Sequence, residues 1–260
     1  SSCSRSVEFE KADQQHTVYY TDSSSCSIDV QFLYPSQYKN TQVLALVQQE
    51  ITAAIFGEKY KTLNGKTAID EYIKNTVTEF ILNKKDMDAA EEANDKEDDL
   101  PPIIYNEEWV INTSILYNEK NILSYAITRY TYLGGAHGLE NTGYLVLNLK
   151  TGKRIQQQDI FTEGYEKSIA AILKAQIMKD GNFATEDELI ENGYIFHEEI
   201  KANGNFFVDE EGIHYIFAPY EIAAYVVGET EVVLSYKDLK PFLRKDSPIA
   251  HIYSKRWIVF

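Results

Sequence analysis

The chain has 260 residues, 44% of them hydrophobic and 25% charged, so it can bury one large core or two small ones. Its 40 acidic residues outnumber its 25 basic ones, and the resulting net charge of -15 disfavours binding to the phosphates of nucleic acid. No run approaches the roughly 18 apolar residues that a membrane-spanning helix needs, so no transmembrane segment is expected.

The start of the sequence bears on its compartment. It opens with Ser-Ser-Cys-Ser and without Met, which is typical of a chain from which an export signal has been removed. Cys3 is therefore our lipidation candidate, as in bacterial lipoproteins. The alternatives are a disulfide between Cys3 and Cys26, or two unmodified thiols. Either of the first two interpretations predicts an extracytoplasmic protein, membrane-anchored as a lipoprotein or periplasmic.

Strands and then two helices are expected in the first hundred residues. Alternating aromatic and β-branched residues predict strands at 7–9, 17–20 and 28–32. Helical spacing of apolar residues then predicts a helix that is capped at Asn40 or Thr41 and ends at Gly57. A second helix is expected from about Ala68, fading into the acidic stretch that follows.

That acidic stretch, residues 86–99, holds eight acids and one lysine, a local charge of -7. A solvated helix end and linker is the favoured interpretation. A calcium loop is excluded, because Asp86 and Asp88 are followed by no glycine at the position where the loop turns. Pro101 and Pro102 end the helix, so the chain is expected to divide into two modules, residues 1–100 and 101–260.

The second module begins with strands. Residues 109–117 and 122–132 predict an antiparallel pair, and further strands are expected at 144–149, 206–208, 213–217, 232–234 and 257–260. Helical faces are expected from Tyr165 to Ile177, after a capping box at Thr185 and Glu188, and from Tyr236 to Leu243. Strand pairs grouped around helices predict an α+β fold with antiparallel or mixed sheets, rather than a regular βαβ alternation.

Motifs that carry chemistry are missing from the sequence. His197-Glu198 starts like a zinc-protease motif, but Lys201 occupies the place of the second histidine. No serine-nucleophile elbow or phosphate-binding loop is found. We therefore expect no catalytic, cofactor-binding or metal-binding residues.

The most unusual local sequence is the glycine-rich stretch from Gly134 to Gly138. Its glycines, including Gly135 and Gly138, imply positive φ angles or a close backbone approach. His137 at its tip is either an exposed binding or acid–base group, or a turn residue bonded to nearby backbone, and the second interpretation is favoured. The segment from Phe217 through Tyr220 and Glu221 to Tyr225 is either a binding lip or a strand exit packed on the core.

These segments resemble the extracytoplasmic domain of the RsiV family of bacterial anti-sigma factors. In that family the domain binds lysozyme, and in other proteins its role is often unknown. Three stretches carry the resemblance: 134–138; 147–153 with 159–161; and 218–225 with Gly228. Residues 28–81 are similar to the module that precedes this domain in RsiV and in the peptidoglycan deacetylase PdaC. The sequence shows no transmembrane helix, sigma-binding segment or deacetylase catalytic domain, and residues 244–260 lie beyond the family pattern.

The resemblance and the charge together favour a binding or sensing protein of the bacterial cell envelope. Its expected partner is a basic protein such as lysozyme, or a peptidoglycan glycan, bound through residues among His137, Gly135, Gly138, Phe217, Tyr220, Glu221 and Tyr225. A cell-wall hydrolase that uses His137 and a purely structural envelope lipoprotein are the alternatives. A deep cleft with His137 and converging carboxylates would favour the enzyme, and a shallow acidic or aromatic surface would favour binding.

Overall fold

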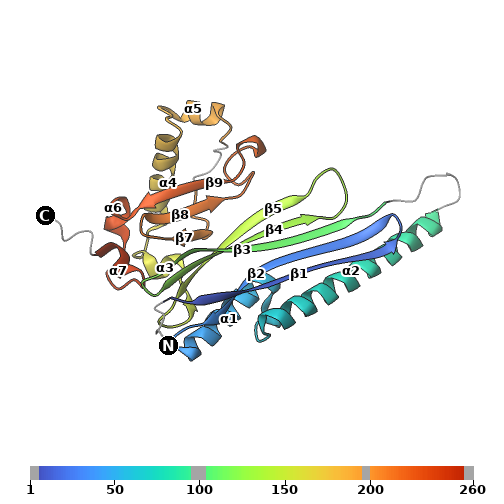
Figure 1. Cartoon of the computed structure of the whole chain (residues 1–260). Helices are drawn as coiled ribbons and strands as arrows, with labels where there is room; N and C mark the ends of the chain where they lie inside the picture. The colour runs from blue at the N-terminus through green and yellow to red at the C-terminus, as the bar shows by residue number, and fades with distance from the viewer. Residues whose placement is uncertain (1–5, 95–103, 195–199, 255–260) are drawn as a thin grey trace.

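A computed structural model describes residues 6–94, 104–194 and 200–254. Figure 1 shows a long sheet with helices α1 and α2 on one side and a second, smaller sheet with the remaining helices on the other. The long sheet is mixed, with its strands in the order β1-β2-β3-β4-β5-β6, and the smaller one is antiparallel, in the order β7-β8-β9. This confirms the α+β class. No helix in the described ranges is long and apolar enough to cross a membrane.

Strands β1 (Glu8–Thr21) and β2 (Ser24–Gln37) form a long antiparallel ribbon. The two short strands expected at 7–9 and 17–20 are parts of one strand. Polar residues between them hid its continuity, because β1 is an edge strand and exposes most of its side chains. In β2 every second side chain is buried, as the alternation predicts, and these are Cys26, Ile28, Val30 and Phe32.

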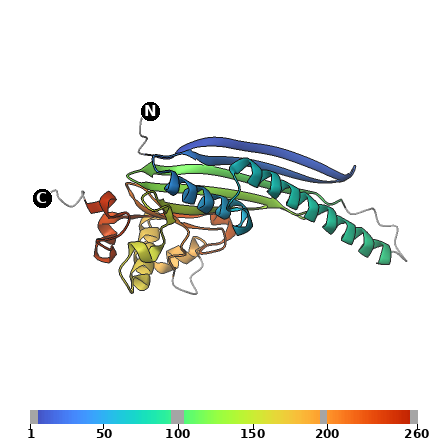
Figure 2. The same ribbon diagram turned by 90° about the horizontal axis from the view of Figure 1, so that it is seen from below.

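Helices α1 (Thr41–Phe56) and α2 (Gly65–Asn94) cover one face of the long sheet, as Figure 2 shows from below. The predicted cap is confirmed: the Asn40 side chain accepts the backbone N–H groups of Gln42 and Val43. Helix α2 continues through the first part of the acidic stretch. There Asp88 pairs at 2.9 Å with the buried Lys84 one turn earlier, which fits a helix end better than a site.

The other strands of the long sheet are β3 (Glu107–Glu119), β4 (Ile122–Tyr132), β5 (Leu139–Asn148) and β6 (Lys153–Arg154). The predicted antiparallel pair β3–β4 is confirmed, and its turn residues Lys120 and Asn121 have φ angles of 49° and 59°, as in a type I′ hairpin. Strand β3 also pairs in parallel with β2. A division after residue 100 would separate these two hydrogen-bonded strands, so the boundary between the modules remains a proposal.

The C-terminal part contains the remaining elements. Its strands are β7 (Phe206–Val208), β8 (Gly212–Phe217) and β9 (Thr230–Ser235). Its α-helices are α3 (Gln157–Ile160), α4 (Glu166–Asp180), α5 (Glu186–Glu191), α6 (Tyr236–Leu239) and α7 (Ala250–Tyr253). Short 3₁₀ turns occur in this part at η2 (Tyr225–Val227) and η3 (Lys240–Phe242), and a third, η1 (Glu58–Tyr60), lies earlier, between α1 and α2. The strand expected at 257–260 lies outside the described residues.

Two buried clusters underlie the two parts of the molecule. The first joins the inner face of the long sheet to α1 and α2, through residues that run from Val7 to Leu149. The second lies around the smaller sheet and runs from Ile155 to Tyr253, with Ile122 and Val146 of the long sheet added. The parts are also hydrogen-bonded, since the buried Ser124 hydroxyl of β4 donates to the carbonyl of Val208 in β7 at 2.6 Å.

Candidate functional site

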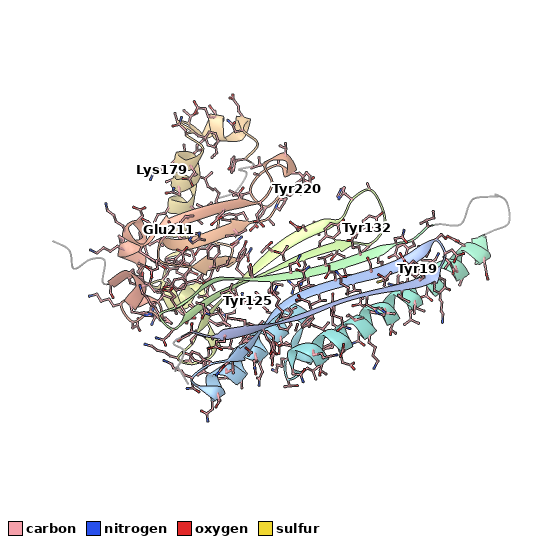
Figure 3. The ribbon with its side chains drawn as sticks, viewed as in Figure 1. Tyr19, Tyr125, Tyr132, Lys179, Glu211 and Tyr220 are labelled. Carbon is pink, nitrogen blue, oxygen red and sulfur yellow. The ribbon has the colours of Figure 1, made fainter. Side chains whose placement is uncertain are left out.

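The glycine-rich loop and the segment after β8 come together in space. The His137 ring lies next to the Tyr225 ring, with centroids 6.5 Å apart and planes inclined by 27°. Tyr225 in turn stacks on Tyr220, at 5.2 Å and 27°. We call these three side chains the aromatic row. In Figure 3, Tyr220 and the Tyr132 end of strand β4 lie on the side of the molecule away from α1 and α2.

The aromatic row faces solvent. Tyr220 is 70% exposed, Tyr225 58% and their neighbour Val226 89%. The loop that carries His137 is bounded by Leu133 and Leu139, which are also exposed. Large apolar side chains are thus exposed to water on two adjoining loops, which is unfavourable for the isolated protein. Such a surface is typical of a site that contacts a partner.

Two different constraints shape the loop under His137. Gly135 has a φ of 103°, and a Cβ there would meet open space, so its backbone conformation is what requires glycine. Gly138 has no positive φ, but a Cβ there would lie 2.4 Å from the Tyr130 ring. The Tyr132 hydroxyl also donates to the Gly135 carbonyl at 2.9 Å. Both expected reasons for glycine, positive φ and close approach, are therefore present.

His137 bonds to the backbone next to it. Its Nδ1 donates to the carbonyl of Gly138 over 3.2 Å, which is the turn arrangement that the sequence favoured. Within the described ranges no carboxylate is hydrogen-bonded to this ring. A histidine without an orienting acid lacks the usual partner of a general base.

Tyr220 has a backbone conformation that is rare for its residue type. Its φ is 70°, in the left-handed region, where a non-glycine residue costs about 1–3 kcal/mol. The next residue holds the loop in place, because the Glu221 carboxylate accepts the backbone N–H of Ala218 and the side-chain amide of Asn203, both at 2.8 Å. Glu221 therefore positions the tyrosines.

Phe217 does not belong to this surface, although the sequence analysis included it. It is the last residue of β8, only 1% exposed, and packs in the second buried cluster. Packing on the core therefore applies to Phe217, whereas the binding lip stays a prediction for the exposed Tyr220 and Tyr225.

Two carboxylates, Glu140 and Glu231, lie close enough to a third, Glu229, to affect its ionisation, and none of the three is among the predicted site residues. Burial raises the pKa of Glu229 above its usual range, and the nearby charges of Glu140 and Glu231 raise it further. Burial, with Glu229 and Glu231 adding to it, also raises the pKa of Tyr144 to about 12. Glu140 follows His137 closely in sequence and Glu229 follows Tyr225, but only the fold shows that they meet.

The two hollows that the structure describes lie away from the aromatic row. Two hollows in the described residues, of about 290 and 510 Å³, are lined respectively by residues around Arg154 and around Lys120. Neither is lined by a member of the aromatic row. An exposed aromatic surface is the arrangement that we expected for binding rather than for hydrolysis.

Comparison with known proteins gives matches over both parts of the chain. Residues 20–140 match the family model for deacetylase PdaC, and residues 158–237 match the model for a protein of unknown function, DUF3298. A curated relative, the peptidoglycan-N-acetylmuramic acid deacetylase PdaC of Bacillus subtilis, is 25% identical over 216 residues. That alignment covers 81% of this chain and 43% of the relative, so the chain spans less than half of that protein's length.

Two solved structures are similar over nearly the whole chain. A crystal structure of a DUF3298 family member from Bacteroides fragilis is 26% identical, with a TM-score of 0.87 over 95% of this chain and 98% of that one. A DUF3298 family protein from Pseudomonas aeruginosa, 12% identical, has a TM-score of 0.60 over 92% and 95% and shows the shared fold alone. The PdaC part of the resemblance is thus confirmed, and the likeness to RsiV stays a prediction. The chain carries a PdaC-type module followed by a DUF3298 domain.

Proposed function

We propose that this protein is an extracytoplasmic binding or sensing protein of the bacterial cell envelope, and that the aromatic row is its ligand-binding surface. The observation that carries the proposal is the contact between His137 and Tyr225, residues 88 positions apart, in one exposed row of rings. Tyrosine is enriched at binding hot spots because one rigid side chain offers a large apolar area and a polar tip.

The backbone at Tyr220 supports the same proposal. The loop holds Tyr220 at a positive φ, and the hydrogen bonds of the Glu221 carboxylate fix this conformation. The ring is thereby kept exposed, although the conformation lowers the stability of the fold. Strain of this kind is common at ligand-binding loops, where a fixed side chain binds with less loss of entropy.

A basic protein such as lysozyme is the proposed ligand. Burial, and after it the charges of Glu140 and Glu231, raise the pKa of Glu229, and a cationic partner would offset the effect of those two charges. Lysine or arginine side chains would also interact with the tyrosine faces. The net charge of -15 would steer such a partner from a distance, and the resemblance to RsiV points to the same class of ligand.

A cell-wall glycan is the second candidate. It is favoured by the PdaC-type module, since the relative of that name is a peptidoglycan deacetylase. Sugar C–H groups pack on tyrosine rings, and carboxylates accept hydrogen bonds from sugar hydroxyls. The affinity for an uncharged glycan would depend little on salt concentration. The affinity for a basic protein would fall as the salt concentration rises.

The experiment is a titration of lysozyme, and separately of soluble peptidoglycan fragments, onto the immobilised protein at about 0.1 M and about 1 M salt. The Debye length falls from about 10 Å to about 3 Å between these conditions, so lysozyme binding should weaken. Replacing Tyr220 or Tyr225 with Ala should weaken binding at least about tenfold, which corresponds to about 1.4 kcal/mol. The matched control is Tyr19→Ala, which removes an equally exposed tyrosine from β1.

Each outcome distinguishes between the candidates. Binding of glycan but not of lysozyme would select the second ligand. Salt-independent binding of lysozyme would keep the partner and refute the electrostatic argument. Failure of both ligands to bind, or equal losses in the Tyr19 control, would refute the proposed surface and leave the structural lipoprotein as the alternative.

A further inference from the structure

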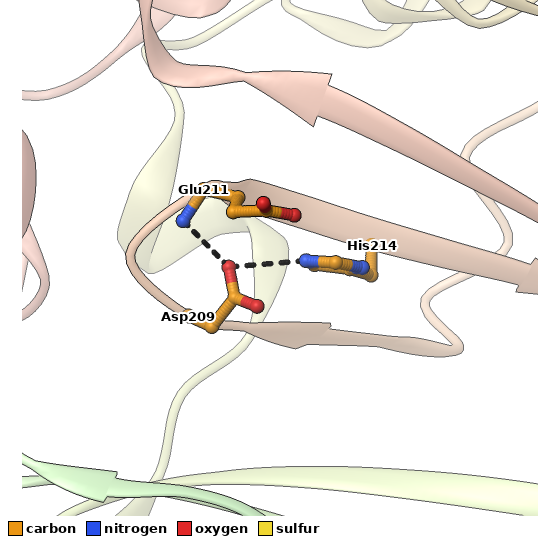
Figure 4. Close-up of side chains that lie close together, drawn as sticks. All are labelled: Asp209, Glu211 and His214. Atoms are coloured by element: carbon orange, nitrogen blue, oxygen red, sulfur yellow. Dashed lines mark hydrogen bonds and ion pairs between the residues drawn. The ribbon is translucent and has the colours of Figure 1, made fainter.

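A second group of polar side chains, whose proposed role lies beyond the proposed function, surrounds the turn between β7 and β8. Figure 4 shows Asp209 and Glu211 in the turn between β7 and β8, and His214 on β8. One ligand atom from each of the three lies within 4.8 Å of the others. His214 is only 5% exposed, and its ring stacks on Phe207 with centroids 4.2 Å apart.

The hydrogen bond on one side of the His214 ring fixes its tautomer. Nδ1 lies 2.6 Å from Oε1 of Glu231. An ionised carboxylate can only accept, so Nδ1 must hold the proton, and in the neutral ring Nε2 then carries a lone pair. Metal-binding histidines almost always donate their other ring N–H to a carboxylate, a backbone carbonyl or water, and Glu231 fills this role here.

The other nitrogen faces a second carboxylate but is not hydrogen-bonded to it. Nε2 of His214 is buried and makes no hydrogen bond of acceptable geometry, although Oδ1 of Asp209 lies 3.0 Å away. That oxygen already accepts the backbone N–H groups of Glu211 and Gly212, at 2.7 and 3.2 Å. A buried lone pair facing a carboxylate oxygen is unfavourable unless a positive charge lies with them.

We propose that Asp209, Glu211 and His214 bind a divalent transition-metal ion, with Zn²⁺ as the best match, and that Glu231 orients the histidine. Zinc takes imidazole nitrogen and carboxylate oxygen at about 2.0–2.2 Å, so two ligands of one ion lie no more than about 4.4 Å apart. The three ligand atoms lie within 4.8 Å of one another, so the group is only slightly wider than a bound ion requires. The nitrogen donor disfavours Mg²⁺ and Ca²⁺, which take oxygen ligands.

A metal-free alternative makes opposite predictions. A doubly protonated His214 would carry the positive charge itself and pair with both Asp209 and Glu231. The group would then be a structural ion pair, complete without a metal, and zinc would neither bind there nor stabilise the protein. The spacing Asp-x-Glu-x-x-His matches none of the paired histidine or cysteine motifs that indicate a metal site in a sequence.

The test is calorimetric titration of Zn²⁺ into the chelator-treated full chain, together with thermal unfolding in Zn²⁺ and in Mg²⁺. We expect one zinc per chain and a Tm that rises with Zn²⁺ but not with Mg²⁺. Glu211→Gln should weaken zinc binding at least about tenfold, and Glu231→Gln by about 10–100-fold. Glu210→Gln is the matched control, since that neighbour pairs instead with Lys120 at 2.8 Å and should leave zinc binding unchanged.

Glu211→Gln keeps the test decisive even if variants of the buried histidine do not fold. Its carboxylate is exposed and makes no hydrogen bond within the described ranges, so the variant should fold as the parent does. Absence of zinc binding in the parent would overturn the proposal. The proposal would also be overturned if Glu211→Gln and Glu231→Gln bound zinc as tightly as the control Glu210→Gln.

Discussion

Replacing Tyr125 with Phe tests how the long sheet holds together where its ladder stops. The parallel pairing of β2 with β3 ends at Gln31 and Asn112. Two residues on, side chains replace the ladder: the N–H of Leu33 donates to Oγ1 of Thr113, and its carbonyl accepts the Tyr125 hydroxyl, both at 2.9 Å. Tyr125 is fully buried, and burial raises the pKa of its phenol, so the hydroxyl stays a donor at ordinary pH.

The magnitude follows from what the substitution leaves behind. Tyr125→Phe keeps the ring and removes one hydroxyl, so no large cavity forms, but the Leu33 carbonyl loses its donor. A buried group left without its hydrogen bond costs about 1–3 kcal/mol. Leu33 is half-buried, so water can partly replace the donor, and we expect about 1–2 kcal/mol. The control Tyr19→Phe, at a residue 71% exposed, should change stability by less than about 0.5 kcal/mol.

The assay is urea unfolding of the parent, Tyr125→Phe, Thr113→Val and the double variant. Since both side chains serve the backbone of Leu33, their costs should not add, and a coupling of at least about 0.5 kcal/mol is expected. A Tyr125→Phe curve that coincides with that of the Tyr19 control would refute this reasoning. Additive costs would show that the two hydrogen bonds act independently.

Three further predictions concern other parts of the chain. Gly135→Ala should cost about 1 kcal/mol, because its φ is 103°, and Gly138→Ala should cost less, because the end of the Tyr130 side chain can move aside; unfolding curves give the order. Glu229→Gln should raise Tm at pH 7 but not near pH 4, because the raised pKa of the Glu229 carboxyl means that its ionisation destabilises the folded state. An equal rise in Tm at both pH values would contradict this explanation. Cys3 should carry a lipid or a disulfide in the native host, and intact mass would show an unmodified, reduced thiol if this is wrong.

Local signals predicted the elements that depend on local chemistry. Asn40 caps α1 and Gly57 ends it because capping involves only neighbouring residues. The turn between the strands predicted at 206–208 and 213–217 is also local, since the Asp209 side chain bonds to the backbone within it. The continuous length of β1 was not predicted, because an edge strand buries too few side chains to show an alternating pattern.

The candidate surface was predicted in its parts and not as a whole. His137, Tyr220 and Tyr225 were each selected for unusual local sequence, but nothing local shows that their two loops touch. Phe217 was included wrongly for the same reason, because aromatic composition does not tell an exposed ring from a buried one. The acids Glu140 and Glu229 are ordinary in a chain with 40 acidic residues until the fold brings them together.

The two loops come together because the smaller sheet docks on the long one. The side chain of Asn205 contributes to this docking by hydrogen bonds to the backbone of β5. The side-chain amide of Asn205, just before β7, pairs with the backbone of β5 as the peptide groups of a neighbouring strand would. Its Oδ1 accepts the N–H of Tyr144 and its Nδ2 donates to the carbonyl of Thr142, both at 3.1 Å. These bonds fix the start of the smaller sheet against β5, the strand that follows the His137 loop. Since β8 pairs with β7 and carries the tyrosine loop at its end, this register sets Tyr225 beside His137. An asparagine in a loop is so common that its sequence context gave no sign of this role.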